Sequence, residues 1–318
     1  MSPAAVTVAV VSWNTRELLL GCLAALHGDV EAGRADVYVI DNGSQDGSAA
    51  AARRHAPWAQ VLLAPGNVGF GAAVNLVAAH TQSEWLAAAN ADVAVTPGAL
   101  QRLLAAGSDP RAGAVAPRLA LPGGDTQHSV GPLPTLPLAL TFALGAHKLS
   151  PQLGDRLCLE TLWDPERPRF VPWAIGAFLL LRRSAFDAIG GFDEHQWMYA
   201  EDLDLGWRLR EAGWLTRYEP GALVKHAGAA ATAQAFGPER TVRFMRATYE
   251  VIARRRGTAR ARLTAAVNLL GTLLRVAWMA PLALARPGRR PQLRATCAWA
   301  GAHRQGLRIK LERDAGGR

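Results

Sequence analysis

The sequence predicts an α/β fold with a mostly parallel central sheet, flanking helices on both faces and a basic, helical C-terminal region. Short apolar runs alternate with segments of helical spacing along the first ninety or so residues. Polar residues follow these runs directly, and Lys and Arg concentrate near the end of the chain. With 318 residues, half of them hydrophobic and 19% charged, the composition is globular and excludes disordered, collagen-like and low-complexity classes.

The elements follow from the periodicity of apolar residues. Residues 6–12 form a near-continuous apolar run that predicts the first strand, and Leu18, Leu19, Cys22, Leu23 and Leu26 then recur at helical spacing. Further strands are expected at 36–40, 60–63, 85–89 and 178–181, and further helices at 49–55, 72–80 and 201–212. A long loop is expected at 122–137. The apolar segment 136–146 is too short to cross a bilayer.

Polar residues gather where the predicted strands end. Asn14, Asp41, Asn67 and the segment Asn90-Ala91-Asp92 each follow a strand. Because ligands of open parallel sheets bind beyond the carboxyl ends of the strands, this edge is the expected site.

Each of these motifs also has an ordinary structural interpretation. Asp41 could accept a hydrogen bond from a nucleobase or ribose, or only form a turn with Asn42 and Gly43. The glycines of 66–71 could admit a nucleotide to the backbone, or only tighten a helix entry; they do not form the dinucleotide-binding fingerprint. Asp92 could hold a divalent cation that bridges a diphosphate, or begin a turn.

A second group of chemically competent residues lies later in the chain. Glu201, Asp202 and Asp204 place three carboxylates within four positions, which suits either a general base or a charged first helical turn. His226 is either a metal ligand or a histidine satisfied within the fold.

Taken in order, these motifs resemble glycosyltransferase family 2, and more narrowly its rhamnosyltransferase-like members. The resemblance runs from about Val6 to His226 and rests on six short motifs in the family's order. They are Val10-Val11-Ser12-Trp13-Asn14-Thr15, Asp41-Asn42-Gly43-Ser44, Gly66-Asn67-Val68-Gly69-Phe70-Gly71, Asn90-Ala91-Asp92, Gly190-Gly191-Phe192-Asp193-Glu194 and Glu201-Asp202-Leu203-Asp204-Leu205-Gly206-Trp207-Arg208.

The resemblance implies a GT-A fold and an inverting transfer from a nucleoside diphosphate sugar. It makes Asp202 the base, Glu201 and Asp204 its supports or sugar contacts, and Asp92 with His226 the ligands of Mg²⁺ or Mn²⁺. Asp41 would read the nucleobase, and Trp173 would stack on a sugar unless it is a core residue. The remaining residues expected at the nucleotide are Ser12, Asn14, Asn67, Gly69 and Asn90. The catalytic domain is expected at 1–236, with a nucleotide half at 1–120 and an acceptor half at 121–236.

The subfamily likeness favours dTDP-L-rhamnose as donor and a glycan or lipid-linked saccharide as acceptor, in cell-surface polysaccharide synthesis. Two alternatives stay open: a family-2 enzyme for another donor such as a UDP-hexose, and a non-catalytic relative that binds nucleotide sugars or an anionic surface. A Rossmann oxidoreductase is disfavoured because Ser12-Trp13-Asn14-Thr15 stands where its glycines are needed.

The C-terminal region, expected at 237–318, carries the chain's basic character. Residues 239–318 hold 18 Lys and Arg against 4 Asp and Glu, whereas the whole chain has a net charge of +9. The apolar stretch 264–285 is long enough to span a bilayer, but Arg275 lies at its middle and arginines flank both sides. This pattern favours a helix lying in an anionic membrane surface over a spanning one, with a helix packed on the catalytic domain as the alternative.

No nucleic-acid-binding motif occurs in this region, so no nucleic-acid partner is expected. Three scattered cysteines and an N-terminus without a signal-peptide pattern predict a cytoplasmic protein. The basic C-terminal region predicts that this protein is peripheral on the inner face of the cell membrane.

Overall fold

The computed structural model describes residues 4–148, 150–228 and 240–311, which fall into two compact units. The first contains the described residues of Met1–Pro132 and Leu157–Ala231, and the second those of Leu133–Arg156 and Thr232–Arg318. The predicted boundary between residues 236 and 237 lies outside the described residues and stays a prediction.

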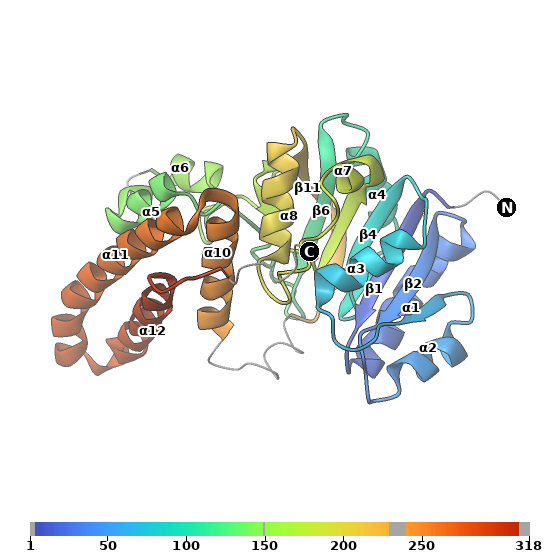
Figure 1. Cartoon of the computed structure of the whole chain (residues 1–318), viewed down its shortest axis with the longest axis horizontal. Coiled ribbons are helices and arrows are strands. Elements are labelled where there is room, and N and C mark those ends of the chain that lie inside the picture. Colours follow the sequence, from blue (N-terminus) through green and yellow to red (C-terminus); the bar gives the residue numbers. More distant parts are fainter. Residues whose placement is uncertain (1–3, 149, 229–239, 312–318) are drawn as a thin grey trace, which may run out of the picture. The chain divides into compact units, whose positions relative to one another are not determined.

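Among the described residues, nine strands of the first unit form one sheet in the order β3-β2-β1-β4-β10-β6-β11-β5, with β8 beside β11 (Figure 1). They are β1 (Val6–Ser12), β2 (Ala35–Asp41), β3 (Gln60–Leu63), β4 (Trp85–Asn90), β5 (Val93–Val95), β6 (Ala112–Ala120), β8 (Arg169–Val171), β10 (Phe178–Arg182) and β11 (Leu215–His226). A small second sheet pairs β7 (Val130–Gly131) with β9 (Trp173–Ala174).

The strands β3, β2, β1 and β4 run parallel, as do β6 and β11, whereas β10 is antiparallel to both of its neighbours. The mostly parallel sheet predicted from the alternation of strands and helices is therefore confirmed. The strands predicted at 6–12, 36–40, 60–63, 85–89 and 178–181 are β1, β2, β3, β4 and β10.

Helices cover both faces of this sheet. They are α1 (Arg16–Glu31), α2 (Ser48–His55), α3 (Phe70–Ala79), α4 (Ala99–Ala106), α7 (Arg183–Ala188) and α8 (Glu201–Glu211). One core joins the strands to α1 and α4 through residues such as Leu23 and Leu103, and the other joins them to α3 and α8 through Val77 and Leu209. Because successive side chains of a strand point to opposite faces, Val8 enters the first core and Ala9 the second.

The second unit is helical. Its elements are α5 (Leu136–Ala143), η1 (Ala146–Lys148), α6 (Pro151–Arg156), α10 (Arg240–Arg256), α11 (Thr258–Ala285), η3 (Pro287–Arg289) and α12 (Arg290–Gly306). A polar network fixes three of these helices: the Tyr249 hydroxyl lies 2.8 Å from Nδ1 of His303 and accepts from Asn268 at 3.1 Å. The helical C-terminal region is confirmed, and the structure adds α5 and α6 to it.

Candidate functional site

The carboxyl ends of β1, β2 and β4 lie at one edge of the sheet. Ser12 stands opposite Asp41 in the β1–β2 register, and Val11 stands opposite Asn90 in the β1–β4 register. The loops that carry the predicted polar residues therefore begin side by side.

The first two of these loops are joined by side-chain hydrogen bonds. Asn14 adopts a left-handed conformation, its side-chain oxygen accepts from the Gln45 amide at 2.8 Å, and its own amide donates to Ser44 at 3.0 Å. Asp41 is buried and closes its own turn, because Oδ1 accepts from the amides of Gly43 and Ser44. No hydrogen bond among the described residues reaches its Oδ2, which leaves that oxygen for a ligand.

Asn42 ties the glycine-containing loop to the end of β2. Its amide nitrogen donates to the side chain of Asn67 at 3.1 Å, and its side-chain oxygen accepts from Val68 at 3.0 Å. The far side of the loop meets a distant segment, since the Trp197 indole donates to the backbone oxygen of Asn67 at 3.1 Å. Asn67 and Gly69 therefore lie at the sheet edge in a loop whose backbone is held from both sides.

Asp92 and His226 form a pair at the same edge. His226 ends β11, which pairs with β5 directly after Asp92, and Nε2 of His226 lies 3.3 Å from Oδ1 of Asp92. Both side chains are largely buried, and Oδ1 makes no hydrogen bond to any described residue. The other ring nitrogen, Nδ1, lies 2.7 Å from the side-chain oxygen of Gln127, which can only accept a hydrogen bond.

This arrangement fits a divalent cation. A carboxylate oxygen without a hydrogen bond faces an imidazole nitrogen whose lone pair is freed by the Nδ1–H bond to Gln127, and such an outer bond is usual for metal-binding histidines. No cluster of three or more His, Cys, Asp or Glu ligands occurs within the described ranges, so diphosphate and water would complete the coordination. Burial and the charge of Asp92 raise the pKa of Cys22 to about 12, which keeps that neighbouring thiol protonated.

Asp202 is linked to Asn90, two residues before Asp92, through the backbone of Gly176 and Ala177. The amide of Gly176 donates to Oδ2 of Asp202 at 3.0 Å, and the carbonyl of the next residue, Ala177, accepts from the amide of Asn90 at 2.9 Å. The Leu203 amide donates to the other carboxylate oxygen at 2.7 Å. Burial raises the pKa of Asp202, and these backbone hydrogen bonds oppose that shift.

Glu201 begins α8 directly after two residues in the left-handed region, Tyr199 (φ 65°) and Ala200 (φ 62°). This backbone is uncommon for residues with a side chain, and it directly precedes the first turn of α8. Oε2 of Glu201 is buried without a hydrogen bond to any described residue. Burial, and then the charge of Asp202, raise the pKa of Glu201 well above its ordinary range.

The third carboxylate, Asp204, is fully buried and accepts from Nε of Arg208 at 2.6 Å. Arg208 in turn donates to the carbonyl oxygens of Ile189 and Gly191. Asp204 therefore positions the loop before α8, which favours the supporting role over a sugar contact.

Two other predicted residues are engaged within the fold. Ser12 is buried with its hydroxyl 3.1 Å from that of Thr15. Trp173 is half-buried, and its indole donates to the Pro132 carbonyl at 3.0 Å. It packs closely on α8, because a Cβ added to Gly206 would stand 2.5 Å from the Cβ of Trp173. The nucleotide contact of Ser12 and the sugar contact of Trp173 stay predictions.

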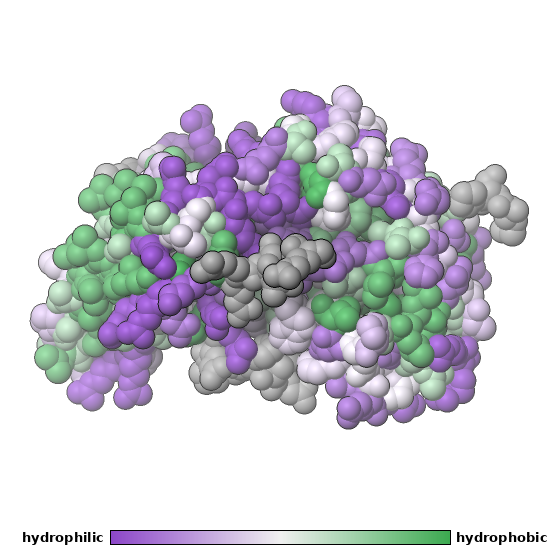
Figure 2. All heavy atoms as spheres, in the orientation of Figure 1, coloured by the Kyte–Doolittle hydropathy of each residue, from purple (hydrophilic) through white to green (hydrophobic). Residues whose placement is uncertain are grey.

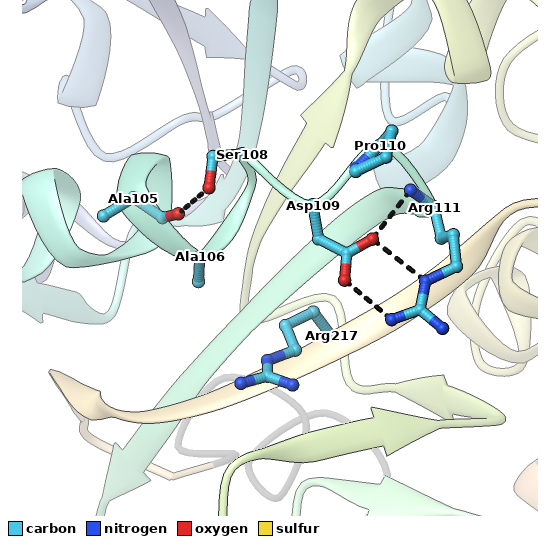
Figure 3. Close-up of a pocket in the computed structure, with 7 residues that line it drawn as sticks. All are labelled: Ala105, Ala106, Ser108, Asp109, Pro110, Arg111 and Arg217. Atoms are coloured by element: carbon cyan, nitrogen blue, oxygen red, sulfur yellow. Dashed lines mark hydrogen bonds and ion pairs between the residues drawn. The ribbon is translucent and has the colours of Figure 1, made fainter.

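A separate hollow of about 500 Å³ lies at the opposite edge, where β6 begins (Figure 3). Asp109 and Arg111 in its wall form a bidentate pair, with Arg217 beside them. Since none of the predicted site residues lines it, we assign it no role in the site.

The positioning roles of three residues were not predicted from the sequence. Gln127 lies in the predicted long loop, where no sequence signal distinguishes it. Gly176 acts through its backbone amide, and the residue type does not mark such a role. Asn42 stands in the Asp41-Asn42-Gly43-Ser44 motif, and the available signal was its side-chain amide directly after the Asp that ends a strand.

The comparisons with known proteins identify a family. Residues 7–190 match the sequence profile of glycosyl transferase family 2, and residues 166–286 match that of glycosyl transferase family group 2. The chain is 39% identical over 206 residues to the N-acetylglucosaminyl-diphospho-decaprenol L-rhamnosyltransferase of Mycobacterium tuberculosis, covering 60% of this chain and 66% of that one. The match thus spans slightly less than two thirds of the relative's length.

Two further similarities are more limited in coverage or sequence identity. Rhamnosyltransferase WbbL of Escherichia coli K12 is 35% identical over 100 residues, which is 31% of this chain and 34% of that one. A mannosyltransferase from Pyrobaculum calidifontis, solved with GDP-Man and Mn²⁺, superposes with a TM-score of 0.59 over 95% of this chain and 87% of its own, at 18% identity. At that identity the superposition shows the fold alone, and it confirms the predicted GT-A architecture.

Proposed function

The chain belongs to glycosyltransferase family 2, and from this premise we propose that it transfers a sugar from a nucleoside diphosphate sugar to an acceptor hydroxyl with inversion at the anomeric carbon. The observation that carries the proposal is the backbone connection between Asp202 and Asn90. It links a half-buried carboxylate to the end of β4, two residues before Asp92 of the Asp92–His226 pair.

Asp202 is the proposed base. Inversion in one displacement needs a single group that removes the acceptor proton while the diphosphate leaves from the opposite face. The amides of Gly176 and Leu203 fix both carboxylate oxygens and so reduce the freedom of the base. Partial burial raises the pKa of the carboxyl toward the range in which a base is effective.

Asp92 and His226 are the proposed ligands of Mg²⁺ or Mn²⁺. The ion would neutralise negative charge that develops on the departing diphosphate. Gln127 holds the His226 ring in the tautomer that presents Nε2 to Asp92, and Asp92 supplies a buried oxygen free of hydrogen bonds.

The nucleotide is proposed to lie along the loops after β1, β2 and β3. Oδ2 of Asp41 would accept from the nucleobase, and the backbone of the 66–69 loop would approach the ribose or diphosphate. Asn14 and Asn42 hold these loops together, and the nucleotide contact predicted for Asn14 stays a prediction.

For the donor we propose dTDP-L-rhamnose, and for the acceptor a lipid-linked saccharide of cell-surface polysaccharide synthesis. The similarity to a decaprenol-diphosphate rhamnosyltransferase supports both. Such an acceptor places the enzyme at the cytoplasmic face of the cell membrane. A UDP-hexose donor is the alternative.

A donor-hydrolysis panel tests this proposal. The full chain is incubated with dTDP-L-rhamnose, UDP-glucose, UDP-N-acetylglucosamine and GDP-mannose, with Mn²⁺ or with EDTA, and the released nucleotide is measured. We expect hydrolysis to be fastest with dTDP-L-rhamnose and to stop in EDTA. Preference for a UDP-hexose contradicts the rhamnosyl donor alone, and no release from any donor contradicts the activity.

A further inference from the structure

In the long helix α11 of the second unit, small residues lie on the buried side and large apolar residues lie on the exposed side. Its buried residues are all small: Ala261, Thr264, Ala265, Gly271, Thr272 and Ala283. Six of its large hydrophobic side chains are exposed instead, namely Leu263, Leu270, Leu273, Leu274, Trp278 and Leu284, and the others are half-buried. Helices that water surrounds bury their large apolar residues, whereas helices in lipid pack on small residues and turn the large ones outward.

The exposed side of α11 is continuous and apolar. From residue 263 to residue 285 every exposed residue is hydrophobic or proline, at intervals of one, three or four that keep them on one face. Trp278 is 77% exposed and Leu270 is 60% exposed. Two or three such residues would be ordinary on a soluble protein, but an unbroken face over more than five turns is not.

Helix α5 extends this face. It crosses α11 so closely that a Cβ on Gly271 would stand 2.6 Å from Cα of Ala143. The neighbouring side chains Leu140 and Leu144 are exposed. Figure 2 shows the hydrophobic surface gathered over the α5 and α11 region.

Arginines flank the apolar face at both ends and specify the partner. Arg260 and Arg262 are exposed before it, and Arg286, Arg289 and Arg290 after it. Arg275, near the middle, points away from the face, since it donates to Thr272 on the buried side at 3.3 Å. A second copy of the chain would bring like charges together, whereas an anionic lipid surface offers acyl chains to the leucines and phosphates to the arginines.

We propose that the second unit docks on an anionic bilayer through α11 and α5, with α11 lying along the membrane and its exposed face in the outer acyl region. This deepens and rests on the proposed function, which requires access to a lipid-linked acceptor. Helix α11 is long and apolar enough to cross a membrane, and only 17% of its most apolar 18-residue stretch is buried. Basic residues at both ends of the helix favour the lying orientation.

Flotation with vesicles tests the surface. The full chain is mixed with phosphatidylcholine vesicles, with or without phosphatidylglycerol, and the bound fraction gives a partition coefficient. The variant Leu270→Ser/Leu274→Ser/Trp278→Ser should bind about 100-fold more weakly to phosphatidylglycerol vesicles. The variant Arg286→Gln/Arg289→Gln/Arg290→Gln should bind at least about 10-fold more weakly there, and its binding should depend less on salt.

A matched control is Leu63→Ser, which replaces a leucine of similar exposure (62%) in the first unit and should leave binding unchanged. Thermal melting and lipid-free donor hydrolysis report whether each variant is folded. Wild-type chain that floats no better than the triple serine variant overturns the proposal. A wild-type dimer in lipid-free solution that the serine variant dissociates also overturns it, by assigning the face to a second copy.

Resistance of bound wild type to alkaline carbonate contradicts the lying orientation and indicates a spanning helix. The two proposals fail separately. Flotation without donor hydrolysis removes the transferase proposal, and hydrolysis without flotation removes the membrane surface.

Discussion

Gly69 lies directly against the backbone of Trp197, so that a Cβ at position 69 would collide with the carbonyl oxygen of Trp197. Its φ of 90° also lies in the region that residues with a side chain rarely adopt. Two distant loops are thus in contact because this residue is glycine, and the contact fixes the loop proposed to approach the nucleotide.

Replacing Gly69 with alanine should therefore weaken donor binding. The loop must move away from Trp197, and we expect at least about a 10-fold increase in the dissociation constant for the nucleotide diphosphate, measured by calorimetry. Gly28→Ala is the control, because Gly28 is exposed on α1 away from this loop, has no positive φ, and an added Cβ would meet no atom within 4 Å. Equal effects of the two changes would contradict the role of the contact.

Asp202→Asn should abolish turnover while leaving donor affinity nearly unchanged. The amide keeps the size of the carboxylate but cannot accept the acceptor's proton, and one general base typically contributes about 10²–10⁴-fold. The measurement is kcat with saturating donor, together with donor affinity by calorimetry. Asp187→Asn, a change to an exposed carboxylate of α7, is the control. Wild-type kcat in Asp202→Asn would refute the assignment.

Gln127→Leu should lower Mn²⁺ affinity although Gln127 is not a proposed ligand. Without its side-chain oxygen, the Nδ1–H of His226 loses its acceptor and the ring its fixed tautomer. Loss of such an outer bond typically costs about 10–100-fold in metal affinity. Paramagnetic resonance titration of Mn²⁺ with nucleotide diphosphate present gives the affinity. The exposed Asp125→Asn in the same loop should change nothing, and an unaltered affinity in Gln127→Leu would argue against the pair as a metal site.

The sequence predicts those parts of the fold that neighbouring residues alone determine through their apolar pattern. The strand at 60–63 was predicted with the bounds that the structure has, because Pro57 lies shortly before this short apolar run and Pro65 shortly after it. The antiparallel β10 between β4 and β6 was predicted as a strand but not placed, since its neighbours are set by contacts distant in sequence. Helix α5 was recognised only as an apolar segment, and its packing on α11 depends on the small size of Gly271.

The sequence predicted which residues form the candidate site, but not the hydrogen bonds that position them. Asp92 and His226 were predicted together from the family resemblance, and their proximity follows from the β5–β11 pairing. The roles of Gly176 and Gln127 arise from a backbone amide and from a loop conformation, and neither leaves a periodic or compositional trace.

The raised pKa of Glu201 leads to a prediction about stability and pH. In the unfolded chain this carboxyl titrates in its ordinary range, whereas burial and then the charge of Asp202 raise its pKa in the native protein. Between the two values the native state binds more protons than the unfolded state, so stability falls as pH rises through this window. Glutamine resembles the protonated carboxyl and does not ionise. Glu201→Gln should therefore melt at a higher temperature than wild type at about pH 8, and the difference should shrink at about pH 5. Scanning calorimetry at both pH values measures this, with Glu17→Gln, an exposed glutamate of α1, as the control. A stabilisation that is the same at both pH values would show that the effect comes from packing and not from the charge of Glu201.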